Sequence, residues 1–322
     1  MDSVSAPPPA SLARGPELRA SRRSHALMHA LMLSATVFWA ANIVAGKIVL
    51  RALDPLTLAQ VRVVGGAVIF AALFLGWRKR PRLRLAPREW GRLALIALFG
   101  ITLNQLFFIS GISRTSAAHA GLIVALGPVM VLILSCALRL EALTVLKTIG
   151  AVVSFAGVAL LTAGKAAGLN GAGWVGDVIL IAGSGVFAYY TVLVKEVADR
   201  YDTVTLNTII FALGAVFMLP FSARALTRAH WTGWPAEAWW GLAFMIFCGT
   251  GLAYFIYALA LTELTATRVA AFNYLQPVIA AVLGVWLLAE TIAAAVVAGG
   301  ALILVGIYLT EHEGRQELGA RS

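Results

Sequence analysis

Amide, phenol and cationic side chains lie inside stretches of this chain that are otherwise apolar. Asn273 and Gln276 are three residues apart, so one face of a helix would carry both amides. Amides and phenols can hydrogen-bond a polar or zwitterionic molecule without adding charge, while aromatic rings offer apolar and cation–π contacts. Polar groups inside apolar helices usually face the protein interior or a wet cavity. The side chains predicted to line a binding cavity are Trp39, Asn42, Arg62, Asn104, Gln105, His119, Tyr189, Tyr254, Tyr257, Asn273 and Gln276.

Ionisable side chains are few in these stretches. Arg62 lies about two turns into its apolar run, where it would meet a substrate carboxylate or the end of a helix. His119 can exchange a proton, since the unperturbed pKa of histidine is about 6.5. Lys47 and Arg268 lie near the ends of runs, which favours snorkelling to the membrane interface. Each polar residue taken alone is explained equally well by a hydrogen bond that only holds two helices together.

Two prolines, Pro128 and Pro277, lie in the middle of apolar runs. Proline removes one backbone donor and frees a carbonyl one turn earlier. In lipid that carbonyl must be satisfied by a neighbouring helix, a side chain or water. Both prolines are therefore predicted to lie inside a helix bundle, as kinks that shape a cavity or act as hinges. Glu141 and Glu290 each precede an apolar run, where the helix dipole favours a carboxylate and predicts a structural role.

The composition predicts a membrane protein. Of 322 residues, 60% are hydrophobic and only 12% are charged, whereas soluble domains carry about 25% charged residues. Ten apolar runs have roughly the 20-residue length that spans a bilayer, which predicts an all-α polytopic membrane fold with ten transmembrane helices. The runs fall near residues 28–50, 55–76, 93–112, 117–138, 143–163, 175–194, 204–221, 241–260, 267–288 and 292–310.

The positions of lysine and arginine predict the orientation in the membrane. The segment WRKRPRLRLAPREWGR (77–92) and the chain ends are rich in these residues, and the loops on the opposite side hold few. Positive residues favour the cytoplasmic side, so both termini are predicted to be cytoplasmic, in a bacterial-type inner membrane. Residues 1–25 are predicted to be a disordered cytoplasmic tail, and residues 311–322 a second cytoplasmic tail. This asymmetry explains the net charge of +10 without nucleic acid.

The sequence repeats itself at a shift of 149 residues, which places Pro128 on Pro277. Near the start of each half the shift is 148. Each repeat contains five predicted helices, in residues 26–165 and 174–310, so the second repeat enters the membrane in the opposite direction. Inverted repeats are typical of secondary transporters, whose substrate site lies near the midplane between the halves. Other matched positions are Glu141 with Glu290, and Gly100, Gly150 and Gly157 with Gly249, Gly299 and Gly306.

The matched glycines also predict packing. Gly150 and Gly157 are seven residues apart on one helix face, and so are Gly299 and Gly306. Small residues at this spacing let two helices approach closely. The fifth and tenth spans are therefore predicted to be scaffold helices that pack against each other.

Each half also combines a helix start rich in small residues, a proline in mid-helix and a glutamate before the last helix. The segments are TSAAHAGLIVALGPVMVLIL followed by RLEALTVLKTIGAVVSFAGVALL, and ELTATRVAAFNYLQPVIAAVLGVWLLAETIAAAVVAGGALILVGIYL. In these features the chain resembles the drug/metabolite transporter superfamily and its EamA-type exporters, over about residues 28–310. In appearance it is most similar to YddG-like amino acid exporters. One departure is that the family's usual Gly-Glu reads Leu-Glu at 140–141 and Ala-Glu at 289–290.

Several classes of chemistry find no support in the sequence. No Asp or Glu lies in the middle of a predicted span, so a carboxylate proton relay or a sodium site is unsupported. There is no Walker loop, no hydrolase elbow and no paired-histidine metal motif. Cys136 and Cys248 both lie in apolar runs, as small buried residues do. We therefore predict no catalytic site, no metal, no cofactor and no nucleic acid partner, and we do not expect an enzyme.

The sequence thus predicts a secondary transporter that exports small metabolites, foremost amino acids including aromatic ones, by alternating access of two inverted halves. The lack of a buried acid favours facilitated diffusion over proton exchange through His119. A nucleotide-sugar or lipid-linked metabolite carrier of the same fold is an alternative, although it would call for more cations around one cavity. A channel or a membrane-embedded enzyme is the alternative from another class. The protein is expected to be a monomer or a weak homodimer in the bilayer.

Overall fold

In the computed structural model of the chain, the described residues form helices joined by turns and short loops, with no strand among them. These are residues 14–76, 86–114, 126–139, 144–166, 174–288 and 297–306, together with 120, 123–124, 294 and 308–309. The first half contains α1 (Arg14–Val49), α2 (Pro55–Gly76), α3 (Pro87–Ala97), the π-helical turn η1 (Leu98–Leu103), α4 (Asn104–Ile112), α6 (Gly127–Ala137) and α7 (Val145–Ala166). The second half contains α8 (Trp174–Val197), α9 (Thr203–Arg228), α10 (Ala236–Ile246), the π-helical turn η2 (Phe247–Leu252), α11 (Ala253–Glu263), α12 (Ala266–Ala271), the 3-10 turn η3 (Phe272–Tyr274) and α13 (Leu275–Leu288), followed by a helix over Val297–Gly306.

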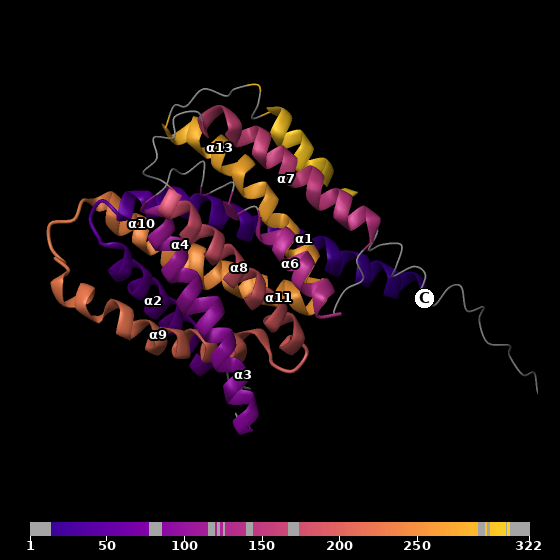
Figure 1. The fold of residues 1–322 in the computed structure, drawn as a ribbon. Helices are drawn as coiled ribbons and strands as arrows, with labels where there is room; N and C mark the ends of the chain where they lie inside the picture. The colour runs from indigo at the N-terminus through magenta and orange to yellow at the C-terminus, as the bar shows by residue number, and fades with distance from the viewer. Residues whose placement is uncertain are drawn as a thin grey trace, which may run out of the picture.

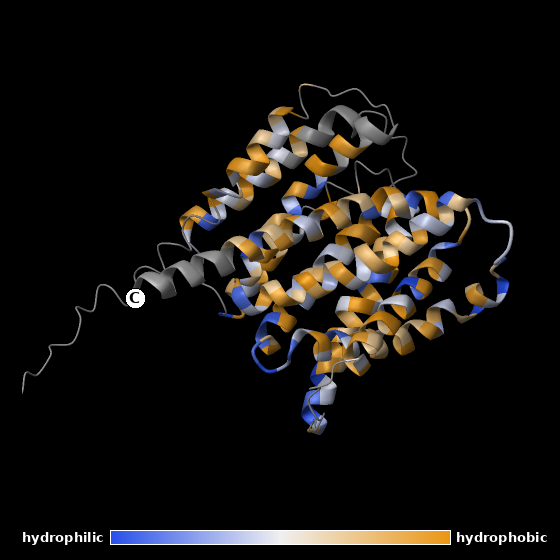
Figure 2. Ribbon diagram, turned by 180° about the vertical axis from the view of Figure 1, so that it is seen from behind, coloured by the Kyte–Doolittle hydropathy of each residue, from blue (hydrophilic) through white to orange (hydrophobic). Residues whose placement is uncertain are grey.

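The helices have the length and composition of membrane spans. Within the described residues, six are long and apolar enough to cross a bilayer, and three shorter apolar helices are Gly127–Ala137, Val145–Gly157 and Val297–Gly306. The interrupted helix α12–η3–α13 fills the remaining predicted position. Large side chains such as Val68, Leu75 and Trp240 are more than 60% exposed, which suits lipid and not water. Figure 2 shows apolar residues along the helix bodies and hydrophilic ones gathered at helix ends and loops. The predicted ten-helix membrane fold is confirmed.

The helix α1 begins at Arg14 and so includes residues 14–25 of the segment predicted to be a cytoplasmic tail. This segment extends the first membrane helix at its amino-terminal end. Residues 1–13 and 311–322 lie outside the described part of the chain.

The two halves repeat each other element by element. A shift of 149 residues carries α3 onto α10 and η1 onto η2, with identical bounds. A π-helical turn widens the helix by one residue per turn and is uncommon in proteins. Its recurrence at the same position in both halves supports the duplication independently of the residue matches. In Figure 1, the pair α2 and α9 and the pair α7 and Val297–Gly306 lie at opposite edges of the bundle.

Two glycine contacts close the edge formed by α7 and the Val297–Gly306 helix. A Cβ at Gly157 would lie 2.7 Å from the Gly299 carbonyl oxygen, and a Cβ at Gly306 would lie 2.5 Å from the Gly150 carbonyl oxygen. Between them, Ser154 Oγ donates to the Ile303 carbonyl oxygen at 3.4 Å, a pair that the 149-residue shift relates. The predicted packing of the fifth and tenth spans is therefore present, and a pseudo-two-fold axis passes between Ser154 and Ile303.

Candidate functional site

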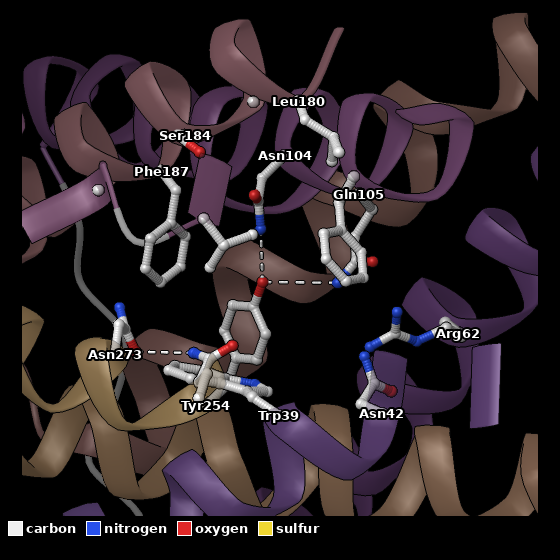
Figure 3. Close-up of a pocket in the computed structure, with 15 residues that line it drawn as sticks. Trp39, Asn42, Arg62, Asn104, Gln105, Leu180, Ser184, Phe187, Tyr254 and Asn273 are labelled. Carbon is white, nitrogen blue, oxygen red and sulfur yellow. Dashed lines mark hydrogen bonds between the residues drawn. The ribbon is translucent and has the colours of Figure 1, made fainter. Parts of the chain in front are cut away.

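A cavity lies between the two repeats in the interior of the bundle (Figure 3). Residues of α1, α2, α4, α6, α8, α11, η3 and α13 reach it, together with Val124. Polar groups and aromatic rings are mixed on its wall. The residues that line it are Trp39, Asn42, Arg62, Asn104, Gln105, Phe108, Val124, Gly127, Leu180, Gly183, Ser184, Phe187, Tyr254, Asn273 and Gln276.

The cavity lies on the pseudo-two-fold axis of the repeat. Trp39 and Phe187 are related by a shift of 148 residues, and their ring centroids are 5.9 Å apart. Gln105 and Tyr254 are related by a shift of 149, and Gln105 Nε2 donates to the Tyr254 hydroxyl at 3.4 Å. Residues so related can touch only where the axis passes between them. The same axis runs between Ser154 and Ile303, so cavity and scaffold share one line of symmetry.

Trp39 and Asn42 are held by the π-helical turn η2. Trp39 Nε1 donates to the Gly249 carbonyl oxygen at 3.0 Å. Asn42 Oδ1 packs so closely on Gly249 that a Cβ there would lie 2.6 Å from it. In the other half, the ring of Tyr190, which is related to Asn42 by a shift of 148, packs on Gly100 of η1 in the same way. In each half, the glycine of the π-helical turn thus makes room for a side chain from the opposite repeat: Gly249 for Asn42 and Gly100 for Tyr190.

The hydroxyl of Tyr254 is the central polar group of the cavity. Asn104 Nδ2 donates to it at 2.8 Å, and Gln105 Nε2 donates to it at 3.4 Å. The ring of Tyr254 meets the ring of Trp39 edge to face, with centroids 5.9 Å apart. Gln105 Oε1 is buried and has no hydrogen-bond partner. In the cavity wall, the rings of Trp39 and Tyr254 therefore lie next to the amides of Asn104 and Gln105.

Arg62 is the charged residue of the cavity wall. It is 1% exposed, and its Nη2 donates to Thr250 Oγ1 on η2 at 3.1 Å. Its Nε and Nη1 atoms are buried without a hydrogen-bond partner. In Figure 3 the guanidinium group lies beside the amide of Asn42, on the side of the cavity away from Asn273 and Phe187.

The amide pair occupies the helix break that the proline was predicted to cause. Gln276 Nε2 donates to Asn273 Oδ1 at 3.0 Å, so both amides share one face as predicted. α12 gives way to the 3-10 turn η3 over Phe272–Tyr274, and α13 begins at Leu275, two residues before Pro277. Proline at this position cannot donate to the residue 273 carbonyl, which is why the helix changes its winding here.

The first half has a break at the matching place. Pro128 lies in the first turn of α6, and Leu126 before it is in a turn. The carbonyl oxygen of Ile123 accepts a hydrogen bond from Ser184 Oγ of α8 at 3.1 Å. A side chain of a neighbouring helix thus satisfies a backbone group upstream of the proline, as a membrane interior requires.

Three of the predicted cavity residues are placed elsewhere or not described. Tyr189 does not line the cavity, because its ring turns toward Phe99, with centroids 4.9 Å apart. Tyr257 does not line it either. Its ring packs on Trp39, with centroids 5.2 Å apart, and its hydroxyl shares a 2.7 Å hydrogen bond with Thr191. His119, like Glu141 and Glu290, lies outside the described residues.

The sequence analysis missed the apolar and small residues of the wall. Phe108, Leu180 and Gly183 are ordinary residues of apolar helices, and nothing in their type marks a cavity. Phe187 and Ser184 carried a usable signal. A shift of 148 places Phe187 on Trp39 and Ser184 on Thr36, so the repeat relates Phe187 to a residue predicted to line the cavity.

The fold and this cavity define a class, the polytopic membrane transporters built from an inverted repeat. The EamA-like transporter family matches the chain twice, over residues 26–163 and 174–311, and the chain belongs to this family. An uncharacterized transporter of Archaeoglobus fulgidus is 31% identical over 290 residues, which cover 89% of this chain and 98% of that protein. The uncharacterized transporter YvbV of Bacillus subtilis is 28% identical over 90% of this chain and 93% of its own length.

Two further likenesses extend the comparison. A chloroplastic WAT1-related protein of Arabidopsis thaliana is 26% identical over 87% of this chain and 68% of its own length. A crystal structure with 21% sequence identity superposes with a TM-score of 0.73, over 90% of this chain and 98% of that one. This structural likeness shows the fold alone. The predicted superfamily, EamA-type and transporter class are confirmed.

Proposed function

We propose that the protein exports amino acids, aromatic ones included, through the cavity between its repeats. The observation that carries the proposal is that eight residues predicted from sequence to bind substrate line this one cavity on the pseudo-two-fold axis. They are Trp39, Asn42, Arg62, Asn104, Gln105, Tyr254, Asn273 and Gln276.

The chemistry of the wall suits a small zwitterion with an apolar side chain. The amides of Asn104, Gln105 and Gln276 offer neutral hydrogen-bonding groups, while the rings of Trp39 and Tyr254 offer a face for an ammonium group or an aromatic side chain. A nucleotide or a sugar phosphate would call for several cations on the wall. Arg62 is the cation among the described lining residues, so the smaller substrate is favoured.

Alternating access would proceed by movement of one repeat against the other about the two proline breaks. The breaks at Pro128 and Pro277 lie beside the cavity on equivalent helices, α6 and α13. Breaks of this kind let half-helices move without breaking a full hydrogen-bond ladder. We place the protein in a bacterial-type inner membrane with both termini cytoplasmic, and we favour facilitated diffusion, because the described lining residues include no carboxylate.

The test is flux of labelled phenylalanine in liposomes that contain the purified full-length protein, without an imposed ion gradient. We expect flux that unlabelled amino acid on the far side accelerates, because a carrier shows counterflow and a channel does not. Gln276→Ala should slow this flux about tenfold, the effect of one lost hydrogen bond in a dry site. The control is Asn207→Ala, which removes a buried amide of α9 that does not line the cavity. Strict dependence on a proton gradient would contradict facilitated diffusion, and equal flux in both variants would contradict the site.

A further inference from the structure

The cavity wall holds a positive charge, Arg62, for which the described lining residues supply no carboxylate. Of the nitrogens of Arg62, Nη2 reaches Thr250 Oγ1, while Nε and Nη1 are buried and unpartnered. The described residues that line the cavity include no Asp and no Glu. A buried ion is costly unless a counter-charge and hydrogen bonds offset the loss of water. Arg62, whose guanidinium group stays charged, is therefore positioned to bind an anion that enters and leaves the cavity.

Two other residues of the cavity wall also carry buried polar atoms without a hydrogen-bond partner. Asn42, beside the guanidinium group in Figure 3, leaves its Oδ1 without a partner, and Gln105 leaves its Oε1 without one. Three lining residues thus carry unsatisfied buried polar atoms. Native proteins satisfy nearly all such atoms. The Arg62 nitrogens are donors that suit a carboxylate, whereas the two amide oxygens are acceptors that suit a donor such as an ammonium group.

We propose that Arg62 is the receptor for a carboxylate of the transported molecule. This deepens the proposed amino acid export and rests on the same cavity. The planar guanidinium group presents N–H donors in a fork that matches the two oxygens of a carboxylate. Thr250 on η2 is a positioning residue, because its bond to Nη2 fixes the plane of the group. The aromatic rings across the cavity then receive the apolar part of the substrate.

The repeat limits the charge that the site can accept. A shift of 148 residues places Arg62 on Ile210, so the other half contributes no equivalent cation. One guanidinium group neutralises one carboxylate. The substrate class is therefore small monocarboxylates with an apolar group, with or without an amine, and a dicarboxylate or a phosphate dianion would carry an unpaired negative charge into the bilayer.

The test measures ligand-induced thermal stabilisation of the purified full-length protein in detergent. The probes are phenylalanine, 3-phenylpropionate, which lacks the amine, and phenylalaninamide, which lacks the carboxylate. We expect the two carboxylates to raise the melting temperature and phenylalaninamide not to raise it. Equal stabilisation by phenylalaninamide, or no stabilisation by either carboxylate, overturns the proposal. This comparison uses the wild-type protein and holds even if a variant fails to fold.

Substitutions at Arg62 test the residue directly. Arg62→Gln should weaken phenylalanine binding roughly 100-fold, as loss of one partner of a buried charged pair does. Arg62→Lys should recover part of the loss, because it keeps the charge and loses the fork. The control Arg51→Gln changes an exposed arginine between α1 and α2 and should bind normally. Unchanged binding in folded Arg62→Gln overturns the proposal.

The two proposals fail in different ways. If carboxylates stabilise the protein and phenylalanine does not move across liposomes, amino acid export is wrong and the carboxylate receptor stands. If phenylalanine flux is normal and equal in wild type and Arg62→Gln, export stands and the receptor is wrong.

Discussion

The edge where α7 meets the Val297–Gly306 helix and the central cavity lie on one pseudo-two-fold axis, but the repeats treat them differently. At the edge both halves keep the same glycines, and the contacts of Gly157 with Gly299 and of Gly306 with Gly150 mirror each other. In the cavity the halves differ, since Asn273 and Gln276 occupy the places of Val124 and Gly127. Duplication has therefore kept the scaffold symmetric and allowed the binding surface to become polar on one side.

The largest effect should come from breaking the symmetric edge. In Gly306→Ala the new Cβ would lie 2.0 Å from Ser154 Oγ and 2.5 Å from the Gly150 carbonyl oxygen, and backbone cannot yield as a side chain does. We expect a loss of about 1–3 kcal/mol in stability, the usual range for overpacking, measured as a lower melting temperature in detergent. Gly157→Ala should behave alike, because it meets the Gly299 carbonyl oxygen at 2.7 Å.

The control for these two variants is Gly91→Ala in α3. No heavy atom lies within 4 Å of a Cβ at that position, and alanine is the better helix former. Its melting temperature should stay level or rise slightly. A melting temperature for Gly306→Ala equal to that of wild type would show that the two scaffold helices do not pack as described.

The next effect should come from making the cavity symmetric. Asn273→Val gives the second half the residue of the first and leaves Gln276 Nε2 without its 3.0 Å partner. We expect amino acid flux to fall about tenfold, because an unsatisfied buried donor costs about 1–3 kcal/mol. The matched control is Asn207→Val, an equally buried amide outside the cavity. If both variants lose flux equally, the asymmetry of the cavity has no special role in transport.

The smallest effect should come from one end of the bundle, where the repeats also differ. Arg92 of α3 forms an ion pair with Glu196 of α8. The repeat-related residues are Gly241, at a shift of 149 from Arg92, and Ile48, at a shift of 148 from Glu196. Both charged side chains are partly exposed, at 35% and 24%, so the pair is expected to contribute less than about 1 kcal/mol.

Salt and charge reversal test this ion pair. Glu196→Gln should lower the melting temperature slightly at low ionic strength and not at 1 M salt, where exposed charges are screened. The double variant Arg92→Glu with Glu196→Arg should restore the wild-type value. A salt-independent loss would point instead to the packing of Glu196.

Nearby, the Tyr201 hydroxyl donates to Glu89 Oε1 at 2.7 Å, and burial and this bond raise the pKa of Tyr201 to about 12.

Much of this architecture was predictable because hydrophobic length and repetition are properties of the chain itself. The ten spans and the duplication needed no contacts, and the amides of the cavity stood out because polarity is costly in lipid. The π-helical turns were not predictable, since their widening depends on what packs against Gly100 and Gly249 from the opposite repeat. Tyr257, outside the described cavity wall, illustrates a related limit: residue type shows that a phenol is buried, but not which neighbours it packs against.

The repeat-related residues that touch across the pseudo-two-fold axis bear on how such a protein can change over evolution. In an antiparallel pair of identical five-helix chains, each axial residue would face its own copy, so every mutation would alter both walls at once. Fusion into one chain removes that coupling. Trp39 faces Phe187, Gln105 meets Tyr254 and Ser154 meets Ile303, three pairs that no longer match. A single gene can thus vary one wall of the cavity while the opposite wall continues to hold the molecule together.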